Sequence, residues 1–228
     1  MRFWNLQFNL LSIRVTVFVI NIIQNDVVMH NRCQTILSDY FTKHKIKVRF
    51  LTRNDYSVHP SWLKLKCFDY IEDDFVLCWD LDLLPKRNSP SIEPLLNINK
   101  INLALDSCIV NRVNTLQSNK YNCGLIGIPK TYKPLIEQIF DSTSDKMSAP
   151  WEQAPINEAV AKNNFIDVHE LDENWNKLYY CNGLLKCCSE GIKAIHYADL
   201  DPESRHASVA LHYKQYFSHA YDVHDGSA

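Results

Sequence analysis

The chain has 228 residues, 46% of them hydrophobic and 22% charged, and a formal net charge of −2. This composition is ordinary for a globular protein, and the length allows one α/β domain with a sizeable core. The near-neutral charge gives no reason to expect a nucleic acid or an anionic membrane as the main partner. With only 5 glycines, no glycine-rich phosphate loop of the Rossmann or P-loop kind can be written, which excludes those nucleotide enzymes.

The chain begins with an amphipathic stretch, residues 1–12, which we expect to form an extension in contact with a sheet edge or a membrane surface. The apolar run from Val15 to Ile23 follows Arg14 and is interrupted by Asn21. It is therefore too short and too polar to span a bilayer, and no small-residue cleavage site follows it. Its β-branched residues favour a first core strand from about Ile13 to Asn21.

Strands and helices alternate beyond this strand. We expect helices over 28–43, from just after Pro60 to Ile71, over Tyr132–Phe140 and over Ala154–Lys162, and strands in the segments KVRFLT, FVLCWDLD, INLALDS and NCGLIGIP. The alternation predicts a mostly parallel sheet covered by helices on both faces, in one domain over residues 13–218. Residues 219–228 are small and polar and are expected to fray.

The 8 cysteines mostly lie singly inside apolar runs, and no Cys-x-x-Cys pair occurs. Such a distribution is typical of buried free thiols in a reducing compartment, which favours the cytoplasm. Disulfides and a zinc site are the alternatives, although the adjacent Cys187 and Cys188 make a poor zinc half-site.

An acidic pair follows the most apolar of the predicted strands. Asp80 and Asp82 come directly after the run from Phe75 to Trp79. Ligands of α/β sheets bind beyond the carboxyl ends of the strands, and two carboxylates there converge if the chain turns, as Pro85 favours. Converging carboxylates suit a hard divalent cation such as Mn²⁺ or Mg²⁺. The pair by itself favours a solvated acidic turn over a metal site.

Further short segments follow Asp80-Leu81-Asp82 in a fixed order. They are YNCGLIG (121–127), WEQAPIN (151–157), LDENWN (171–176) and AIHYA (194–198), with the basic segment KLKCFDYI (64–71) upstream. Together they resemble the motifs of glycosyltransferases with the GT-A fold, in particular family-eight-like retaining members or a compact related family. The resemblance covers roughly residues 13–200.

The resemblance implies a Rossmann-like α/β fold, a mostly parallel mixed sheet flanked by helices in a single domain. It also implies an activity: the metal-dependent transfer of a hexose from a nucleotide sugar, with a UDP-sugar expected, to a hydroxyl of a glycan or glycoconjugate. The expected cofactor is Mn²⁺ or Mg²⁺, and retention of the anomeric configuration is modestly favoured over inversion.

The resemblance also implies roles for individual residues. The metal ligands would be Asp80, Asp82 and His196, and Asp80 would also contact the ribose. The remaining donor contacts would be Asn21 to the nucleoside, Lys64 and Lys66 to the diphosphate, and Asn122 and Gly124 to the sugar, where the missing side chain of glycine lets a ligand approach the backbone.

Two segments would supply the catalytic groups, namely Glu152 with Gln153, and Asp106. In a retaining enzyme Gln153 would stabilise the oxocarbenium-like centre, and in an inverting enzyme Glu152 or Asp106 would act as general base. Each of these side chains could instead be an ordinary polar group at a strand or helix end.

One motif of the retaining family is missing. A Gly-x-Lys-Pro-Trp stretch often follows its histidine, whereas this chain reads HYADLDPESR, so the phosphates would need Lys64, Lys66 or Arg205. Two other functions remain open: a non-catalytic nucleotide-sugar binding module of the same fold, and a HAD-type phosphohydrolase that works through an aspartyl phosphate.

Overall fold

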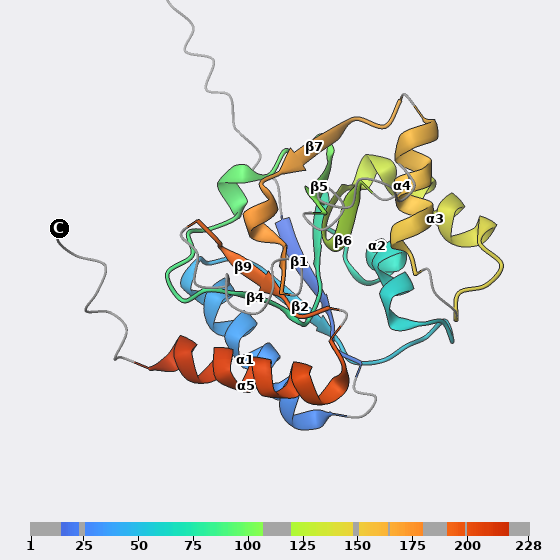
Figure 1. The fold of residues 1–228 in the computed structure, drawn as a ribbon. Helices are drawn as coiled ribbons and strands as arrows, with labels where there is room; N and C mark the ends of the chain where they lie inside the picture. Colours follow the sequence, from blue (N-terminus) through green and yellow to red (C-terminus); the bar gives the residue numbers. More distant parts are fainter. Residues whose placement is uncertain are drawn as a thin grey trace, which may run out of the picture.

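The computed structural model describes residues 15–22, 26–106, 120–147, 151–163, 165–179, 191–198 and 200–218. A six-stranded sheet in the order β2-β1-β3-β6-β5-β7 forms the centre of the protein (Figure 1). Its strands are β1 (Val15–Ile20), β2 (Lys47–Leu51), β3 (Phe75–Trp79), β5 (Ile101–Leu105), β6 (Tyr121–Pro129) and β7 (Val168–Leu171). The expected extension over residues 1–12 and the expected tail over 219–228 lie outside the described residues.

The sheet is mostly parallel, as predicted, with one exception. β1 pairs in parallel with β2 and β3, and β5 with β7, whereas β6 runs antiparallel to both of its neighbours, β3 and β5. Because β6 is reversed, its first residues lie at the edge where β1, β3 and β5 end. The amide of Asp80 accordingly donates a hydrogen bond of 2.8 Å to the carbonyl of Gly124.

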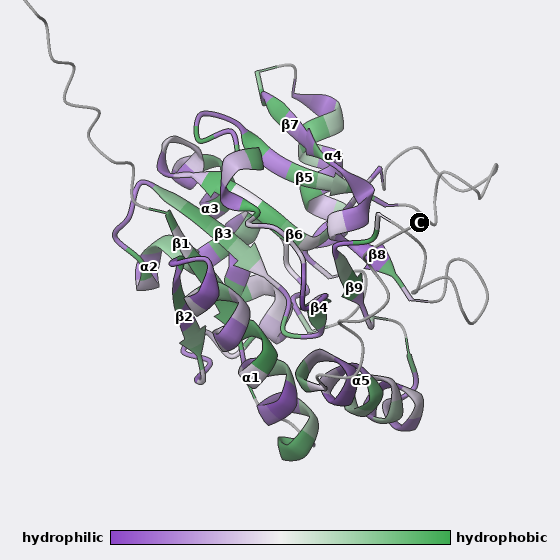
Figure 2. Ribbon diagram, turned by 90° about the vertical axis from the view of Figure 1, so that its left-hand side faces the viewer, coloured by the Kyte–Doolittle hydropathy of each residue, from purple (hydrophilic) through white to green (hydrophobic). Residues whose placement is uncertain are grey.

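Helices cover both faces of the sheet, as predicted. One face carries α1 (Val27–Lys43) and α5 (Pro202–Phe217), which lie side by side in Figures 1 and 2. The other carries the 3₁₀ helix η1 (Pro60–Lys66), α2 (Cys67–Tyr70), α3 (Lys133–Ser142) and α4 (Gln153–Lys162). The helix expected after Pro60 is thus largely 3₁₀ and becomes α-helical only at Cys67.

The residues of β3 show why the sheet has two covered faces. Phe75, Leu77 and Trp79 pack into the core on the α1 and α5 side, and Val76 and Cys78 pack into the core on the other side. Successive side chains of a strand point to opposite faces, so a strand that is apolar throughout must be buried on both. Figure 2 shows the resulting hydrophobic strands between helices of mixed hydropathy.

A second, three-stranded sheet was not predicted. It consists of β4 (Leu83–Pro85), β9 (Ala194–His196) and β8 (Lys177–Leu178) in the order β4-β9-β8. β4 and β9 are antiparallel, with Leu83 opposite His196. This pairing brings the predicted strand AIHYA next to the acidic pair, and the amide of Tyr197 donates to the carbonyl of Asp82 at 3.0 Å.

Helix α5 was not predicted either, although its start carries recognisable signals. The side chain of Asp201 caps the helix by accepting a hydrogen bond from the Ser204 amide at 2.9 Å, and Pro202 occupies the first turn. Both are typical of helix N-termini. None of the described helices is long and apolar enough to cross a membrane.

The cysteines in the described part of the chain agree with the prediction of buried thiols. Cys33, Cys67, Cys78 and Cys123 are buried and free. The other four, Cys108, Cys181, Cys187 and Cys188, lie outside the described residues, and the cytoplasmic location stays a prediction.

Candidate functional site

A pocket of about 470 Å³ opens at the carboxyl edge of the main sheet, a size suited to a small-molecule ligand. Nine of the eleven residues predicted for the site line it: Lys64, Asp80, Asp82, Asp106, Asn122, Gly124, Glu152, Gln153 and His196. The two others, Asn21 and Lys66, do not. The structure therefore brings together at one edge residues that come from segments as far apart as η1 and β9.

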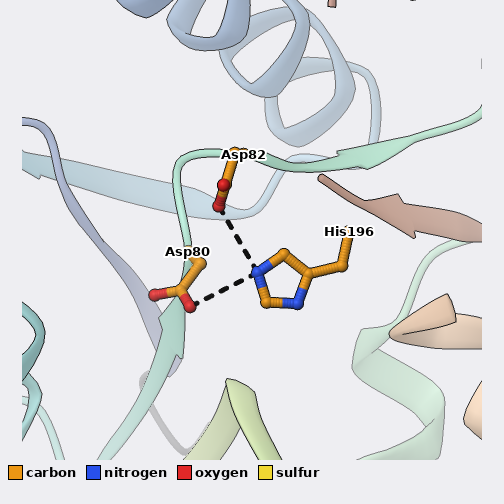
Figure 3. Close-up of side chains that lie close together, drawn as sticks. All are labelled: Asp80, Asp82 and His196. Atoms are coloured by element: carbon orange, nitrogen blue, oxygen red, sulfur yellow. Dashed lines mark ion pairs between the residues drawn. The ribbon is translucent and has the colours of Figure 1, made fainter. Parts of the chain in front are cut away.

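The centre of the pocket is formed by Asp80, Asp82 and His196 (Figure 3). The chain turns directly after β3, where the amide of Leu83 donates to the carbonyl of Asp80 at 3.1 Å. Both carboxylates consequently face the imidazole, whose Nε2 lies 3.6 Å from Asp80 Oδ2 and 3.4 Å from Asp82 Oδ1. One ligand atom from each of the three residues lies within 4.8 Å of the others, so the predicted convergence of the two carboxylates is confirmed.

The pKa values of the triad are set by burial and by the charges of the three residues on one another. Burial raises the pKa of Asp82, but the hydrogen bond and charge of His196 together with Arg205 outweigh burial and lower it to about 2. Burial lowers the pKa of His196, but the two carboxylates outweigh that effect and raise it. The pKa of Asp80 is raised, because burial outweighs the attraction of Lys64 and His196. A divalent cation would relieve the repulsion between the carboxylates, and carboxylate with imidazole is a donor set that Mn²⁺ accepts.

Gly124 lines the pocket and also makes room for the imidazole of His196. A Cβ atom at this position would lie 2.4 Å from Cε1 and 2.7 Å from Nδ1 of His196. The space left by the missing side chain is thus occupied by the imidazole, which packs against the backbone of β6. The pairing of β5 with β6 also shifts register between Leu103 and Ala104, a type of irregularity that is common next to functional sites.

Lys64 lies inside the pocket wall and is almost fully buried. Its ammonium lies 2.6 Å from Asp80 Oδ1 and 2.6 Å from Glu152 Oε1, and it donates a third hydrogen bond, of 2.9 Å, to the Cys123 carbonyl. Burial lowers its pKa, but the two carboxylates outweigh burial and raise it. Because an ammonium has three donors, none is left for a diphosphate, and Lys64 instead fixes Asp80 and Glu152.

Lys66 is not part of this cluster. Its ammonium lies 4.5 Å from the centre of the Phe140 ring and 3.8 Å from Asp141 Oδ1, so it packs against α3 rather than facing the pocket.

Asn21 is buried, but its side chain is directed at α1. Its Nδ2 donates to Gln34 Oε1 at 2.6 Å, and its Oδ1 lies 2.8 Å from Nδ1 of His30. The neighbours Ile20 and Ile22 line the pocket in its place, as expected from the alternation of side chains along an extended chain. His30, which was not predicted, lines the pocket next to them.

Several of the motif residues connect α4 with the beginning of β6. Gln153 Oε1 accepts a hydrogen bond from the Cys123 amide at 3.1 Å, and Asn157 bonds both the amide and the carbonyl of Tyr121. Asn176, from the segment LDENWN, donates to Asn122 Oδ1 at 2.8 Å. These amides hold the edge of β6 in place, and no pattern in the sequence indicated their partners.

Aromatic and basic residues complete the wall. The rings of His59 and Trp151 are stacked with their centres 3.7 Å apart and an angle of 13° between the planes, and both line the pocket. Arg205, at the beginning of α5, also lines it, with Nη1 3.8 Å from Asp82 Oδ2. His59 was not singled out from the sequence, because a histidine before a helix is a common feature with no functional signal of its own.

A scan against models of protein families finds no match, and a search of curated proteins finds none. Solved structures do match. The chain is similar to a glycosyltransferase involved in the glycosylation of the major capsid of PBCV-1, with a TM-score of 0.64 and 10% identity over 87% of this chain and 99% of that one. It is also similar to the glycosyltransferase GlyE of Streptococcus pneumoniae, with a TM-score of 0.52 and 13% identity over 91% of this chain and 64% of that one.

These likenesses agree with the geometry described above. Both solved structures are of glycosyltransferases, and the first is matched over nearly its whole length. The chain, a single α/β domain with an Asp-x-Asp and histidine triad at the carboxyl edge of its sheet, has the GT-A-like fold of glycosyltransferases.

Proposed function

We propose that the protein is a metal-dependent glycosyltransferase that moves a hexose from a nucleotide sugar, a UDP-sugar, to a hydroxyl of a glycan or glycoconjugate. The observation that carries this proposal is the triad of Asp80, Asp82 and His196 inside a pocket at the carboxyl edge of a GT-A-like sheet. The solved structures that the chain resembles are of glycosyltransferases, which favours this proposal over a HAD-type phosphohydrolase.

The triad would hold Mn²⁺ or Mg²⁺, with Mn²⁺ favoured because one ligand is an imidazole. The bound cation would stabilise the charge that develops on the departing nucleoside diphosphate. Lys64 holds Asp80 in place through its 2.6 Å contact, so the carboxylate is oriented before a ligand arrives.

The lining of the pocket suggests how the donor would lie in it. Ile20, Ile22 and Met29 form an apolar end, which suits a flat nucleobase, and the polar side chains Asp106 and Asn122 lie across the sheet, where they could bond sugar hydroxyls. This direction follows the strand order from β1 through β3 to β6 and β5. The diphosphate would then pass the triad at β3.

Arg205 is the residue that we assign to the donor phosphates. Its side chain is 32% exposed, its Nη1 is 3.8 Å from Asp82 Oδ2, and its buried Nε has no hydrogen-bond partner among the described residues. A guanidinium with unused donors beside a metal site suits an anionic oxygen. It would replace the lysine of the missing Gly-x-Lys-Pro-Trp stretch.

The surroundings of Glu152 support retention over an inversion in which this residue is the base. Its carboxylate is almost fully buried and is held by Lys64 at 2.6 Å, so it is poorly placed to take a proton from an acceptor. In a retaining reaction the oxygen of the departing diphosphate would accept that proton, and Gln153, fixed by the Cys123 amide, would lie near the anomeric carbon. Asp106 would remain the base if the reaction inverts.

The test is a thermal-unfolding panel of nucleotide sugars with and without Mn²⁺, followed by hydrolysis of the best donor in the absence of acceptor. A true donor raises the unfolding temperature only with Mn²⁺, because a ligand that binds the native state stabilises it, and it is slowly hydrolysed. Asp82→Ala should lower that hydrolysis by at least about a hundredfold. Asp167→Ala, which removes an exposed ion pair with Lys100, is the matched control.

Two results would contradict the proposal. Unchanged Mn²⁺-dependent binding in Asp82→Ala would show that the triad is not the metal site. Binding of a nucleotide sugar without any hydrolysis would show that the chain is a non-catalytic binding module.

A further inference from the structure

His30 is a polar side chain at the apolar end of the pocket, and a contact outside the pocket determines which of its nitrogens carries the proton. His30, in the first turn of α1, lines the pocket next to Ile20, Ile22 and Met29. Its Nδ1 faces away from the pocket, towards Asn21 Oδ1 at 2.8 Å. Asn21 itself does not line the pocket, so the remaining nitrogen of the imidazole, Nε2, lies on the side of the ring that faces the ligand space.

The contacts of Asn21 determine which nitrogen of His30 carries the proton. Asn21 Nδ2 donates to Gln34 Oε1 at 2.6 Å, so its other atom, Oδ1, is the one that faces the imidazole. An amide oxygen can only accept a hydrogen bond, and Nδ1 of His30 must therefore carry the hydrogen. His30 and Gln34 are one helical turn apart on α1, which lets Asn21 bond both at once.

The imidazole is consequently an acceptor towards the pocket. Burial lowers the pKa of His30, although the nearby carboxylates of Asp26 and Asp82 oppose that effect, and a neutral ring protonated on Nδ1 has a bare lone pair on Nε2. The described residues give Nε2 no hydrogen-bond partner. A half-buried acceptor that has no partner in the described protein and faces a ligand space favours a ligand that brings a donor.

We propose that His30 Nε2 reads the nucleobase of the donor by accepting a hydrogen bond from a ring N–H. Uracil, thymine and guanine have such a donor, whereas cytosine and adenine present a ring nitrogen that can only accept. Two acceptors facing each other repel and leave both unpaired, so His30 would disfavour cytidine and adenosine nucleotides, whose exocyclic amino group would have to shift to reach Nε2. This inference rests on the proposed function and adds the base specificity of the same pocket.

The direct test compares four ligands on the unmodified protein by calorimetry in the presence of Mn²⁺. These are UDP, CDP, the 3-methyl derivative of UDP, in which the ring N–H is replaced, and the 5-methyl derivative, which has the same additional bulk but keeps the N–H. UDP and 5-methyl-UDP should bind with similar affinity. CDP and 3-methyl-UDP should each bind about tenfold more weakly, because the bond is lost and Nε2 stays unpaired.

A variant series locates the effect on His30. In His30→Gln the amide can rotate to present either its oxygen or its nitrogen, so the preference for UDP over CDP should fall to a ratio near one while binding is retained. His169→Gln is the matched control, since His169 lies on β7 with its Nε2 bonded to the Leu95 carbonyl and does not line the pocket. Its ratio should equal that of the unmodified protein.

The outcomes separate this inference from the proposed function. If UDP and 3-methyl-UDP bind equally well, or CDP binds better than UDP, the assignment to His30 is wrong and the glycosyltransferase proposal stands. If none of the four ligands binds with Mn²⁺, both are wrong. The comparison of UDP with its two methyl derivatives needs no variant, so it holds even if His30→Gln does not fold.

Discussion

The two cations beside the triad, Lys64 and Arg205, are held in opposite ways. Lys64 comes from η1, is almost fully buried, and uses all three of its donors on Asp80, Glu152 and the Cys123 carbonyl. Arg205 comes from α5, is one-third exposed, and lies at a loose 3.8 Å from Asp82. A cation beside the site can therefore bind a ligand only if some of its hydrogen-bond donors are not already used by the protein. Arg205 meets this condition and Lys64 does not.

The largest expected effect is a loss of stability when Lys64 is replaced. Lys64→Met leaves Asp80 and Glu152 without their shared cation, and removing one partner of a buried ion pair costs about 3–5 kcal/mol. Chemical denaturation should show that loss in the free energy of unfolding. Lys66→Met is the control, because this side chain is two residues away and makes only loose contacts, 4.5 Å to the centre of the Phe140 ring and 3.8 Å to an exposed carboxylate, each worth about 1 kcal/mol or less. Equal losses in both variants would contradict the structural role of Lys64.

The next effect concerns the packing of His196 on β6. Gly124→Ala would place a Cβ atom 2.4 Å from the imidazole and displace the ring, so Mn²⁺ affinity should fall by about 10–100-fold. Titration with Mn²⁺ followed by electron paramagnetic resonance measures this directly.

Gly127→Ala is the matched control for that variant. Its Cβ would also be too close to a ring, 2.6 Å from Cζ of Phe75, but on the same strand away from the triad. It should lower stability without a specific loss of Mn²⁺ affinity. If Gly124→Ala retains full affinity for Mn²⁺, His196 is not a ligand in the orientation described.

A smaller effect, on the affinity for UDP, is expected when Arg205 is replaced. Arg205→Met should weaken UDP binding by about tenfold or more, because a charge-assisted hydrogen bond is lost, while the free energy of unfolding changes little. Uridine, which has no phosphate, should bind both forms equally. Arg205→Lys should restore part of the affinity, since it keeps the charge but not the planar donors. An equal loss for UDP and uridine would mean that Arg205 acts on the fold and not on phosphate.

The smallest expected effect is a pH dependence of stability that comes from His212, which connects α5 to the three-stranded sheet. His212 on α5 lies between the Tyr197 hydroxyl at 2.9 Å and the Pro85 carbonyl at 3.0 Å, and burial lowers its pKa from 6.5 to about 4. The unfolded chain therefore binds a proton that the folded protein does not. The contribution of His212 is complete above pH 6.5 and is lost as the pH falls towards 4.

The size of this effect is about 1 kcal/mol between pH 6 and pH 5. It is measured as the difference in unfolding free energy between the unmodified protein and His212→Gln, whose amide can still donate to the Pro85 carbonyl. The difference should shrink as the pH falls. A difference that stays constant over this range would mean that His212 does not titrate as described.

Much of the site could be predicted because its signals are local. The apolar run that ends at Asp80 predicts a buried strand, and the order of the later motifs led to His196, Asn122 and Glu152. The prediction about Asn21 named the right segment, yet the pocket is lined by its neighbours and by His30. This difference comes from the direction of a side chain at a strand end, which depends on where α1 packs.

The sequence by itself determined the alternation of strands and helices, the burial of β3 on both faces, and the acidic pair at its end, because hydrophobic periodicity and turn residues act over a few positions. Only the tertiary structure decided that β6 is antiparallel, that Lys64 pairs with the carboxylates of Asp80 and Glu152, and that α5 brings Arg205 to the triad. These features depend on contacts between segments that are not neighbours in the chain, from 16 residues apart for Lys64 and Asp80 to 123 for Asp82 and Arg205. Such pairings are chosen by the packing of the whole core, and no local pattern in the chain records them.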